Sequence, residues 1–263
     1  MTPGSRKGSE PLIGRLPIRP ARFAKAPNQA KFRASCQTQT RLPPLKSPWR
    51  PPPPAPRTAE VAAYLAARMC HDFISPASAI VSGLDLLDDP SAQDMREDAM
   101  NLIGGSARKL ADLLSFTRVA FGASATAETF DARELAKLAQ GVFGHMRAEM
   151  DWQVEPASLN KPAARAILNL AQMAGAALPT GGVAKIRAVE EGATIVLAVE
   201  AVGPRARLRP EVLAGLRGEA MGEGLHGHWV QAYYVHLFMT DAGGRIFADV
   251  AEEKVTFAAS IPA

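Results

Sequence analysis

The chain has 263 residues, of which 47% are hydrophobic, and it carries a formal net charge of +4. This length allows one large or two small domains with real hydrophobic cores. No apolar run approaches the roughly 18 residues of a membrane span, and the N-terminus has no continuous apolar core of the secretory kind. The two cysteines, Cys36 and Cys70, form neither a disulfide framework nor a metal-binding spacing, so we expect a reducing, cytoplasmic setting.

The positive charge is confined to the first 57 residues. Residues 1–57 hold 12 Lys/Arg and one acid, a net of +11, whereas the other 206 residues hold 18 Lys/Arg and 25 Asp/Glu, a net of −7. The segment also holds 13 of the 21 prolines, which predicts a disordered basic tail. It could be a solvated tail, the product of a start codon placed too far upstream, or a basic arm for a membrane, nucleic acid or partner. The acidic remainder is not expected to bind nucleic acid directly.

Two amphipathic helices are expected within residues 58–123, because apolar residues recur at steps of three and four. The first stripe comprises Val61, Leu65, Met69, Phe73, Ala77, Ile80, Leu84 and Leu87. The second comprises Ala99, Leu102, Ile103, Ser106, Leu110, Leu113, Thr117 and Phe121. Asp88–Pro90 ends the first helix, and Ser91–Asp94 resembles a capping box that opens the second.

These two helices predict an antiparallel hairpin, since the connection between them is short. One hairpin cannot cover both of its apolar stripes. Two hairpins from two copies of the chain can do so as a four-helix bundle, which predicts a homodimer.

Residues 124–263 predict an α+β domain in which helices pack against a mixed sheet. We expect helices near 132–143, with Asp131 as the cap, near 162–178 and near 229–240. We expect strands at 152–154, 184–189, 194–199, 246–250 and 255–260.

The first helix displays a histidine on its polar side. Met69 and Phe73 belong to the apolar stripe, and a shift of two residues is about 200° of helix rotation, so His71 points away from the stripe. A neutral imidazole is a competent nucleophile toward phosphorus, and Asp72 could orient it. The same face continues with small or apolar residues that suit docking of another protein, namely Ile74, Ser75, Ser78 and Ser82.

The segment Cys70–Pro76 resembles the phospho-acceptor box of bacterial sensor histidine kinases, His-acid-x-x-Ser/Thr-Pro. Ile74 replaces the usual basic residue of that box. The resemblance covers residues 58–263 and implies a dimeric helical hairpin followed by a histidine-kinase-like (Bergerat-type) α/β sandwich domain. Within it, His71 and Asp72 would be the catalytic residues.

The motifs that hold ATP in those kinases are degraded in this chain. The asparagine box corresponds to Asn169–Ala174, where Met173 takes the metal-ligand position, and a thioether is a poor ligand for Mg²⁺. The adenine motif corresponds to Ala201–Arg205 and lacks its carboxylate. In the phosphate lid, Trp229 and Gln231 replace glycines whose backbone must approach phosphate.

Two other patterns near the lid are only weak indications of a ligand site. Residues 222–227 fit G-x-G-x-x-G by spacing, but no expected strand precedes them, so a dinucleotide site is a weak interpretation. His226 and His228 form a lone His-x-His that lacks a third metal ligand nearby in sequence.

A persistent histidine box beside degraded ATP motifs resembles the alphaproteobacterial ChpT family of histidine phosphotransferases. The resemblance implies a donor in the receiver domain of a hybrid histidine kinase and acceptors among response regulators, including a cell-cycle regulator. It implies Mg²⁺ supplied by the receiver, with neither ATP nor another cofactor held by this chain. The alternatives are a non-catalytic response-regulator scaffold, a regulator phosphatase that uses His71 or Ser75, and an active kinase, which the degraded motifs oppose.

Overall fold

The computed structural model describes residues 58–122, 127–220 and 226–263. The expected basic tail of residues 1–57 and most of the G-x-G-x-x-G pattern at 222–227 lie outside the described residues. None of the described helices is long and apolar enough to cross a membrane.

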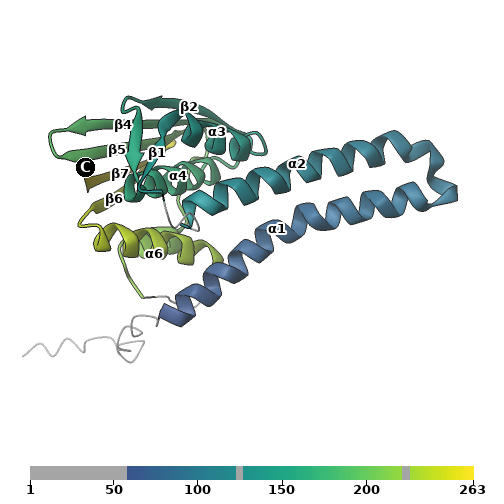
Figure 1. Cartoon of the computed structure of the whole chain (residues 1–263), viewed down its shortest axis with the longest axis horizontal. Helices are drawn as coiled ribbons and strands as arrows, with labels where there is room; N and C mark the ends of the chain where they lie inside the picture. The colour runs from purple at the N-terminus through teal and green to yellow at the C-terminus, as the bar shows by residue number, and fades with distance from the viewer. Residues whose placement is uncertain (1–57, 123–126, 221–225) are drawn as a thin grey trace, which may run out of the picture. The chain divides into compact units, whose positions relative to one another are not determined.

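The described chain begins with the expected helical hairpin (Figure 1). Helix α1 spans Thr58–Asp88 and runs without interruption through Pro76, and helix α2 spans Arg96–Ala120. Most residues of the two predicted stripes lose much of their exposure where the helices face each other, but Leu84 and Leu102 remain 48% and 41% exposed. A single hairpin therefore leaves part of its apolar surface uncovered.

The expected capping box at Ser91–Asp94 is wrong. A 3₁₀ helix, η2, occupies Pro90–Met95, and its cap is Asp89, whose carboxylate accepts from the backbone N–H of Ser91 at 2.8 Å and from its hydroxyl at 2.7 Å. A proline directly after an aspartate suits the first position of such a turn, because proline has no N–H to satisfy and its φ is already helical. The hydroxyl of Ser91 is thereby engaged with Asp89.

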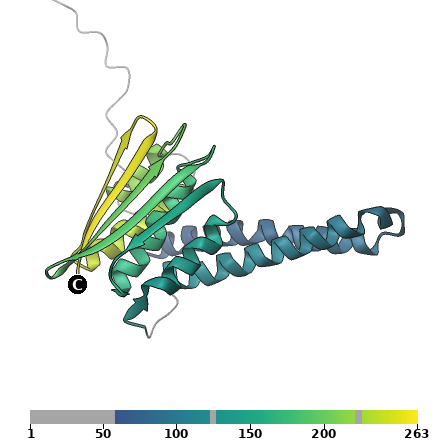
Figure 2. The ribbon, with the colours of Figure 1, turned by 90° about the horizontal axis from the view of Figure 1, so that it is seen from above.

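The remainder of the chain is the expected α+β domain, whose larger sheet has strand order β2-β4-β5-β7-β6. Its strands are β2 (Ala148–Val154), β4 (Gly182–Glu191), β5 (Thr194–Val202), β6 (Arg245–Ala251) and β7 (Lys254–Pro262). Strands β2 and β4 are parallel and the other pairs are antiparallel. Alternate residues of β5 and β7 are buried, so the sheet presents one face to the core (Figure 2).

Helices cover that face of the sheet. They are α3 (Ala132–Phe143), α4 (Lys161–Ala176), α5 (Pro210–Leu216) and α6 (His226–Asp241). Helix α4 packs across β4, β5 and β7, and eleven of its residues are buried. The cap of α3 is confirmed, because the carboxylate of Asp131 accepts from the backbone N–H groups of Arg133 and Glu134. The small strands β1 (Thr129–Asp131) and β3 (Ser158–Asn160) and the short α5 were not predicted.

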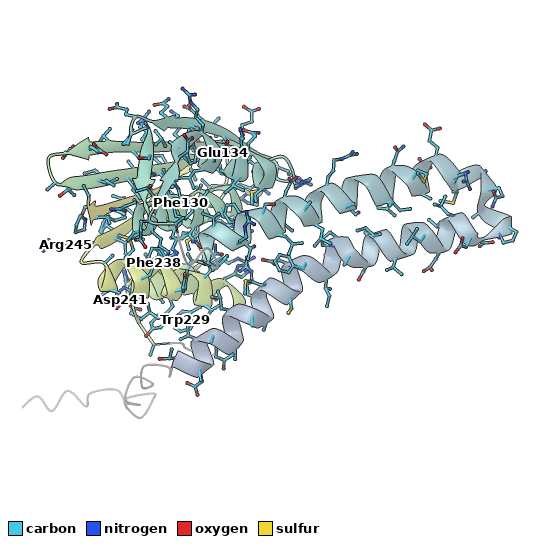
Figure 3. All side chains as sticks on the ribbon, in the orientation of Figure 1. Phe130, Glu134, Trp229, Phe238, Asp241 and Arg245 are labelled. Carbon is cyan, nitrogen blue, oxygen red and sulfur yellow. The ribbon has the colours of Figure 1, made fainter. Side chains whose placement is uncertain are left out.

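Contacts near the start of α1 and at the end of α2 help to join the hairpin to this domain. Near the start of α1, Val61 packs with Trp229, Val230 and Tyr233 of α6, and Trp229 is labelled beside α1 in Figure 3. At the end of α2, the side-chain amide of Asn169 donates to the carbonyl of Ala120 at 2.9 Å. These contacts place the middle of α1 against the domain.

Candidate functional site

The side chain of His71 lies on the surface of α1 and is 85% exposed. Its Nδ1 atom lies 3.3 Å from Oδ1 of Asp72. When Nδ1 carries the proton it donates to this carboxylate, and Nε2 then presents its lone pair to solvent. The arrangement gives an accessible nucleophile whose ring is oriented by an acid next to it in sequence.

Asp72 is in turn held by Arg68, one turn earlier on α1. The Nε atom of Arg68 donates to Oδ2 of Asp72 at 2.9 Å, while its Nη1 donates to the carbonyl of Gly227 at 2.7 Å and lies 3.5 Å from Nδ1 of His228. The Arg68 side chain is only 19% exposed. A series of charge-assisted hydrogen bonds therefore connects the imidazole on α1 with the first turn of α6.

Arg68 is a site residue that the sequence analysis missed. An Arg and an Asp four residues apart on an expected helix are neighbours on its surface, so the pair with Asp72 could have been noticed. The contact with Gly227 spans 159 positions along the chain and had no sequence signal.

The predicted docking residues follow His71 along the same helix. Ile74 is 64% exposed, and Ser75, Ser78 and Ser82 are exposed as well. Ser75 shares a hollow with His71, whereas the helical rise places Ser78 and Ser82 about 10 and 16 Å farther along α1. The structure thus brings Ser75 to the imidazole and leaves the other two serines on the exposed hairpin.

Two hollows flank the imidazole, and both are lined by Arg68, His71 and Asp72. One, of about 330 Å³, lies between α1 and the first turn of α6. The other, of about 280 Å³, also includes Lys109 of α2 and His145, the residue whose Nε2 lies 2.9 Å from Oδ2 of Asp112. Part of the surface next to His71 therefore belongs to the α+β domain and not to the hairpin.

The residues that correspond to the asparagine box form hydrogen bonds inside the core. Asn169 is fully buried, and besides Ala120 its amide donates to the carbonyl of Arg165 at 2.9 Å. Its Oδ1 accepts from Nε2 of Gln231, which also donates to Oε1 of Gln172 at 2.7 Å. Met173, at the metal-ligand position, is 6% exposed. These side chains satisfy one another and do not form a set of oxygen ligands for Mg²⁺.

The residues that correspond to the adenine motif and to the phosphate lid are also packed in the domain. Ala201 is fully buried in β5, where the motif would need a carboxylate. Trp229 stacks on Tyr233 with ring centroids 4.4 Å apart, and its indole N–H donates to the carbonyl of Glu219. A bulky, bonded side chain thus stands where a glycine would let the backbone approach phosphate.

His228 lies beside two guanidinium groups. Its pKa lies below the ordinary value, first because the imidazole is partly buried and then because Arg68 and Arg209 are near. The carboxylates of Glu211 and Asp72 act in the opposite direction with smaller effect. Burial and the neighbouring cations therefore both favour the neutral form of the ring.

Comparison with known proteins shows a similarity to histidine phosphotransferases. Residues 132–254 match the family described as histidine phosphotransferase C-terminal domain. The chain is 33% identical over 201 residues to the protein phosphotransferase ChpT of Brucella abortus (strain 2308), covering 76% of this chain and 95% of that protein.

Two solved structures were also matched. A bacterial phosphotransferase solved at 1.7 Å superposes with a TM-score of 0.70 and 31% identity, over 80% of this chain and all of that one. The catalytic domain of histidine kinase ThkA matches 51% of this chain and 93% of its own length, with 19% identity and a TM-score of 0.41.

Proposed function

Because this chain belongs to the ChpT family of histidine phosphotransferases, we propose that it relays phosphoryl groups between receiver domains through His71. Its activity as a protein histidine phosphotransferase follows from the family. The observation that supports His71 as the carrier is its 85% exposed imidazole, oriented through Nδ1 by Asp72.

The transfer consists of two in-line displacements. Nε2 of neutral His71 attacks the phosphorus of an aspartyl phosphate, the new N–P bond forms, and the P–O bond to the donor breaks to release its carboxylate. The ring then carries a positive charge, which Asp72 offsets across Nδ1–H, so no proton has to leave. The carboxylate of a second receiver attacks the phosphohistidine and restores the neutral ring. Positioning and charge neutralisation dominate such transfers.

This chain would hold neither ATP nor a metal ion of its own. Oδ1 of Asn169 accepts from Gln231, and Met173 offers only sulfur, so these residues do not fit a Mg²⁺–nucleotide complex. The reaction would therefore involve no ATP, and its Mg²⁺ would be held by the receiver domain.

The active form would be a homodimer built on the hairpin. Large apolar side chains remain exposed on α1 and α2, among them Val81 at 56%, Leu84 at 48% and Met100 at 53%. Exposed apolar surface of this kind marks an interface in a soluble protein. A second hairpin would cover it as a four-helix bundle with two His71 sites.

The partners would be receiver domains, one of a hybrid histidine kinase as donor and others of response regulators as acceptors. A cell-cycle regulator would be among the acceptors, and the relay would operate in the cytoplasm. A receiver would dock on α1 around Ile74, Ser75, Ser78 and Ser82, and part of it would reach the α+β domain through the two hollows beside His71.

Phosphate transfer from a radiolabelled phospho-receiver tests this function. We expect acid-labile label on the chain that disappears in His71→Gln and persists in His236→Gln, a histidine that lines neither hollow. Binding of the receiver with no labelled chain would support a scaffold instead. Free phosphate without a labelled intermediate would support a phosphatase, and labelling from ATP alone would support a kinase.

A further inference from the structure

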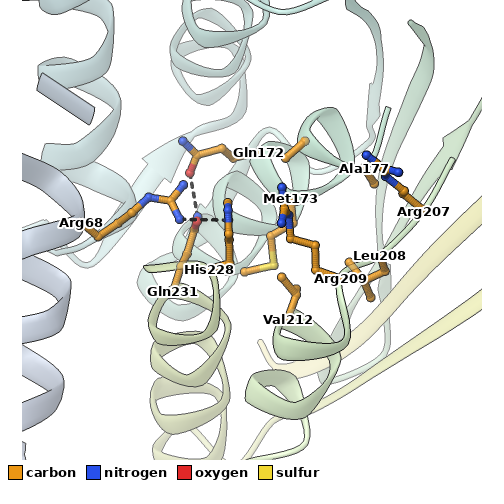
Figure 4. A pocket seen from close by; sticks show the side chains of 11 residues that line it. Arg68, Gln172, Met173, Ala177, Arg207, Leu208, Arg209, Val212, His228 and Gln231 are labelled. Atoms are coloured by element: carbon orange, nitrogen blue, oxygen red, sulfur yellow. Dashed lines mark hydrogen bonds between the residues drawn. The ribbon is translucent and has the colours of Figure 1, made fainter. Parts of the chain in front are cut away.

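A separate cavity lies behind the phosphotransfer site, between α1, α4, α5 and α6 (Figure 4). It has a volume of about 120 Å³, several times the roughly 30 Å³ that one water occupies in the liquid. Met173, Ala177, Val212 and Gln231, all at most 8% exposed, belong to its lining. The cavity is therefore recessed, with room for one compact group but not for a whole nucleotide.

The lining of this cavity carries an excess of positive charge. Arg68, Arg207 and Arg209 all contribute to it, and His228 lies among them. Arg68 donates through Nε and Nη1 to Asp72 and Gly227. Among the described residues, the guanidiniums of Arg207 and Arg209 have no hydrogen bond or ion pair.

Hydrogen-bond donors and acceptors complete the lining. Figure 4 shows His228 between Arg68 and Arg209, with Gln172 above it. The lowered pKa of His228, caused by burial and then by Arg68 and Arg209, agrees with two cations close to the ring. Glu211 is the carboxylate from α5 that acts on the same imidazole. Together with Asp72, the ion-pair partner of Arg68, it makes two carboxylates against three guanidiniums, so a positive excess remains.

We propose that this cavity is a binding site for a small phosphate-bearing anion, held by Arg209 and Arg68 with His228 and Gln172 as further polar contacts. Guanidinium groups match phosphate oxygens in geometry and charge. The recess favours a small solute over the acidic surface of a docked protein, because Met173, Ala177 and Val212 of its lining are buried, whereas Arg207 and Arg209 are exposed. The assignment does not depend on the proposed relay.

The position of Arg68 connects this cavity to the phosphotransfer site. The same guanidinium lines the cavity and holds Asp72, which contacts His71. An anion that bonds to Arg68 changes the field at Asp72 and competes for its donors. Occupancy of the cavity is therefore sensed at the imidazole, about one helical turn away.

Titration of the full chain with inorganic phosphate, followed by NMR, tests the site. We expect saturable shifts at His228 and at His71 with one common dissociation constant, and no such shifts with sodium chloride at matched ionic strength. Arg209→Gln should raise that constant about tenfold, the effect of losing one charge-assisted hydrogen bond. Arg209 caps α5 with its backbone alone, so this substitution leaves the fold intact.

Arg245→Gln is the matched control, since Arg245 is an exposed arginine on β6 outside the cavity lining. Equal shifts in wild type and Arg209→Gln, or shifts that grow linearly with salt, overturn the site. Saturation at His228 without any response at His71 overturns the link through Arg68. A competing response to an acidic peptide but not to phosphate means that the cavity is a protein contact and overturns the proposal. Loss of label transfer in the relay assay would leave this titration unaffected.

Discussion

Arg68 and Asp72, one helical turn apart on α1, form an ion pair in which Nε of the guanidinium lies 2.9 Å from Oδ2 of the carboxylate. The other carboxylate oxygen faces Nδ1 of His71, and the other end of the guanidinium is bonded to Gly227. The imidazole of His71 on the hairpin is thereby oriented, through Asp72 and Arg68, by the contact with Gly227 of the α+β domain. This arrangement explains why the imidazole can be exposed and still have a defined orientation.

Asp72→Asn should slow phosphorylation of His71 while leaving the protein folded. The amide keeps the size of the carboxylate but neither offsets the charge of the phosphorylated ring nor fixes its tautomer. We expect a loss on the order of 10- to 100-fold in the single-turnover rate, since misplacing a reacting group costs up to about 100-fold. Asp85→Asn, an exposed acid farther along α1, is the control and should react at the wild-type rate. Equal rates for the two variants would remove Asp72 from the mechanism.

Arg68→Ala should lower the free energy of unfolding by about 1–3 kcal/mol, the range for losing hydrogen bonds from a charged group that is largely shielded from water. The reason is that Gly227 loses its donor and Asp72 loses its counterion. Urea unfolding followed by circular dichroism measures the change. Arg108→Ala removes an exposed arginine from α2 and should have little effect. If Arg68→Ala and Arg108→Ala unfold at the same urea concentration, the bonds of Arg68 to Gly227 and Asp72 do not stabilise the fold.

Gln231→Ala should destabilise the α+β domain and still not restore ATP binding. The substitution leaves Oδ1 of Asn169 and Oε1 of Gln172 without their donor, and an unsatisfied buried polar group costs about 1–3 kcal/mol. Thermal unfolding and titration with Mg-ATP measure the two effects. Gln140→Ala, on the exposed side of α3, should leave the unfolding temperature unchanged. Tight Mg-dependent ATP binding by any of these proteins would be evidence for a kinase.

Leu84→Glu combined with Leu102→Glu should convert the proposed dimer into a monomer. Both leucines are more than 40% exposed on the single hairpin, and a charge at either would have to be buried in a four-helix bundle. Sedimentation of the full chain at micromolar concentration measures the mass. Phe247→Glu changes an equally apolar, 64% exposed residue on β6 and should leave the mass unchanged. A monomeric wild-type protein under the same conditions would refute the dimer.

Acidification should weaken the fold through His228. Its pKa is lowered in the folded state, chiefly by burial, so below about pH 6.5 the unfolded chain binds more protons than the folded chain. Stability is therefore unaffected by this group well above that pH and falls as the pH drops from about 6.5 through the lowered value. Urea unfolding at about pH 7.5 and 5.5 should show that the free energy of unfolding falls less in His228→Gln than in the wild type. The groups that face the ring, Arg68, Arg209, Glu211 and Asp72, stay unchanged in that comparison.

Several elements followed from local sequence alone. The period of the apolar residues gave both hairpin helices, and Asp131 marked the start of α3, because periodicity and capping depend on residues a few positions apart. The second helix cap was misjudged because Asp89 engages the hydroxyl of Ser91 before that serine can act as a cap. Strands β1 and β3 are three residues each, too short to leave a period.

The sequence by itself identified the candidate site residues, namely a histidine and an acid on the polar side of a helix, and an asparagine box without its metal ligand. Only the tertiary structure decided how these residues are connected. Arg68 meets Gly227 across 159 positions, and Asn169 meets Gln231 across 62. Such pairs leave no trace in local periodicity, because they depend on how α1 and α4 pack against α6, and that packing is set by the whole hydrophobic core.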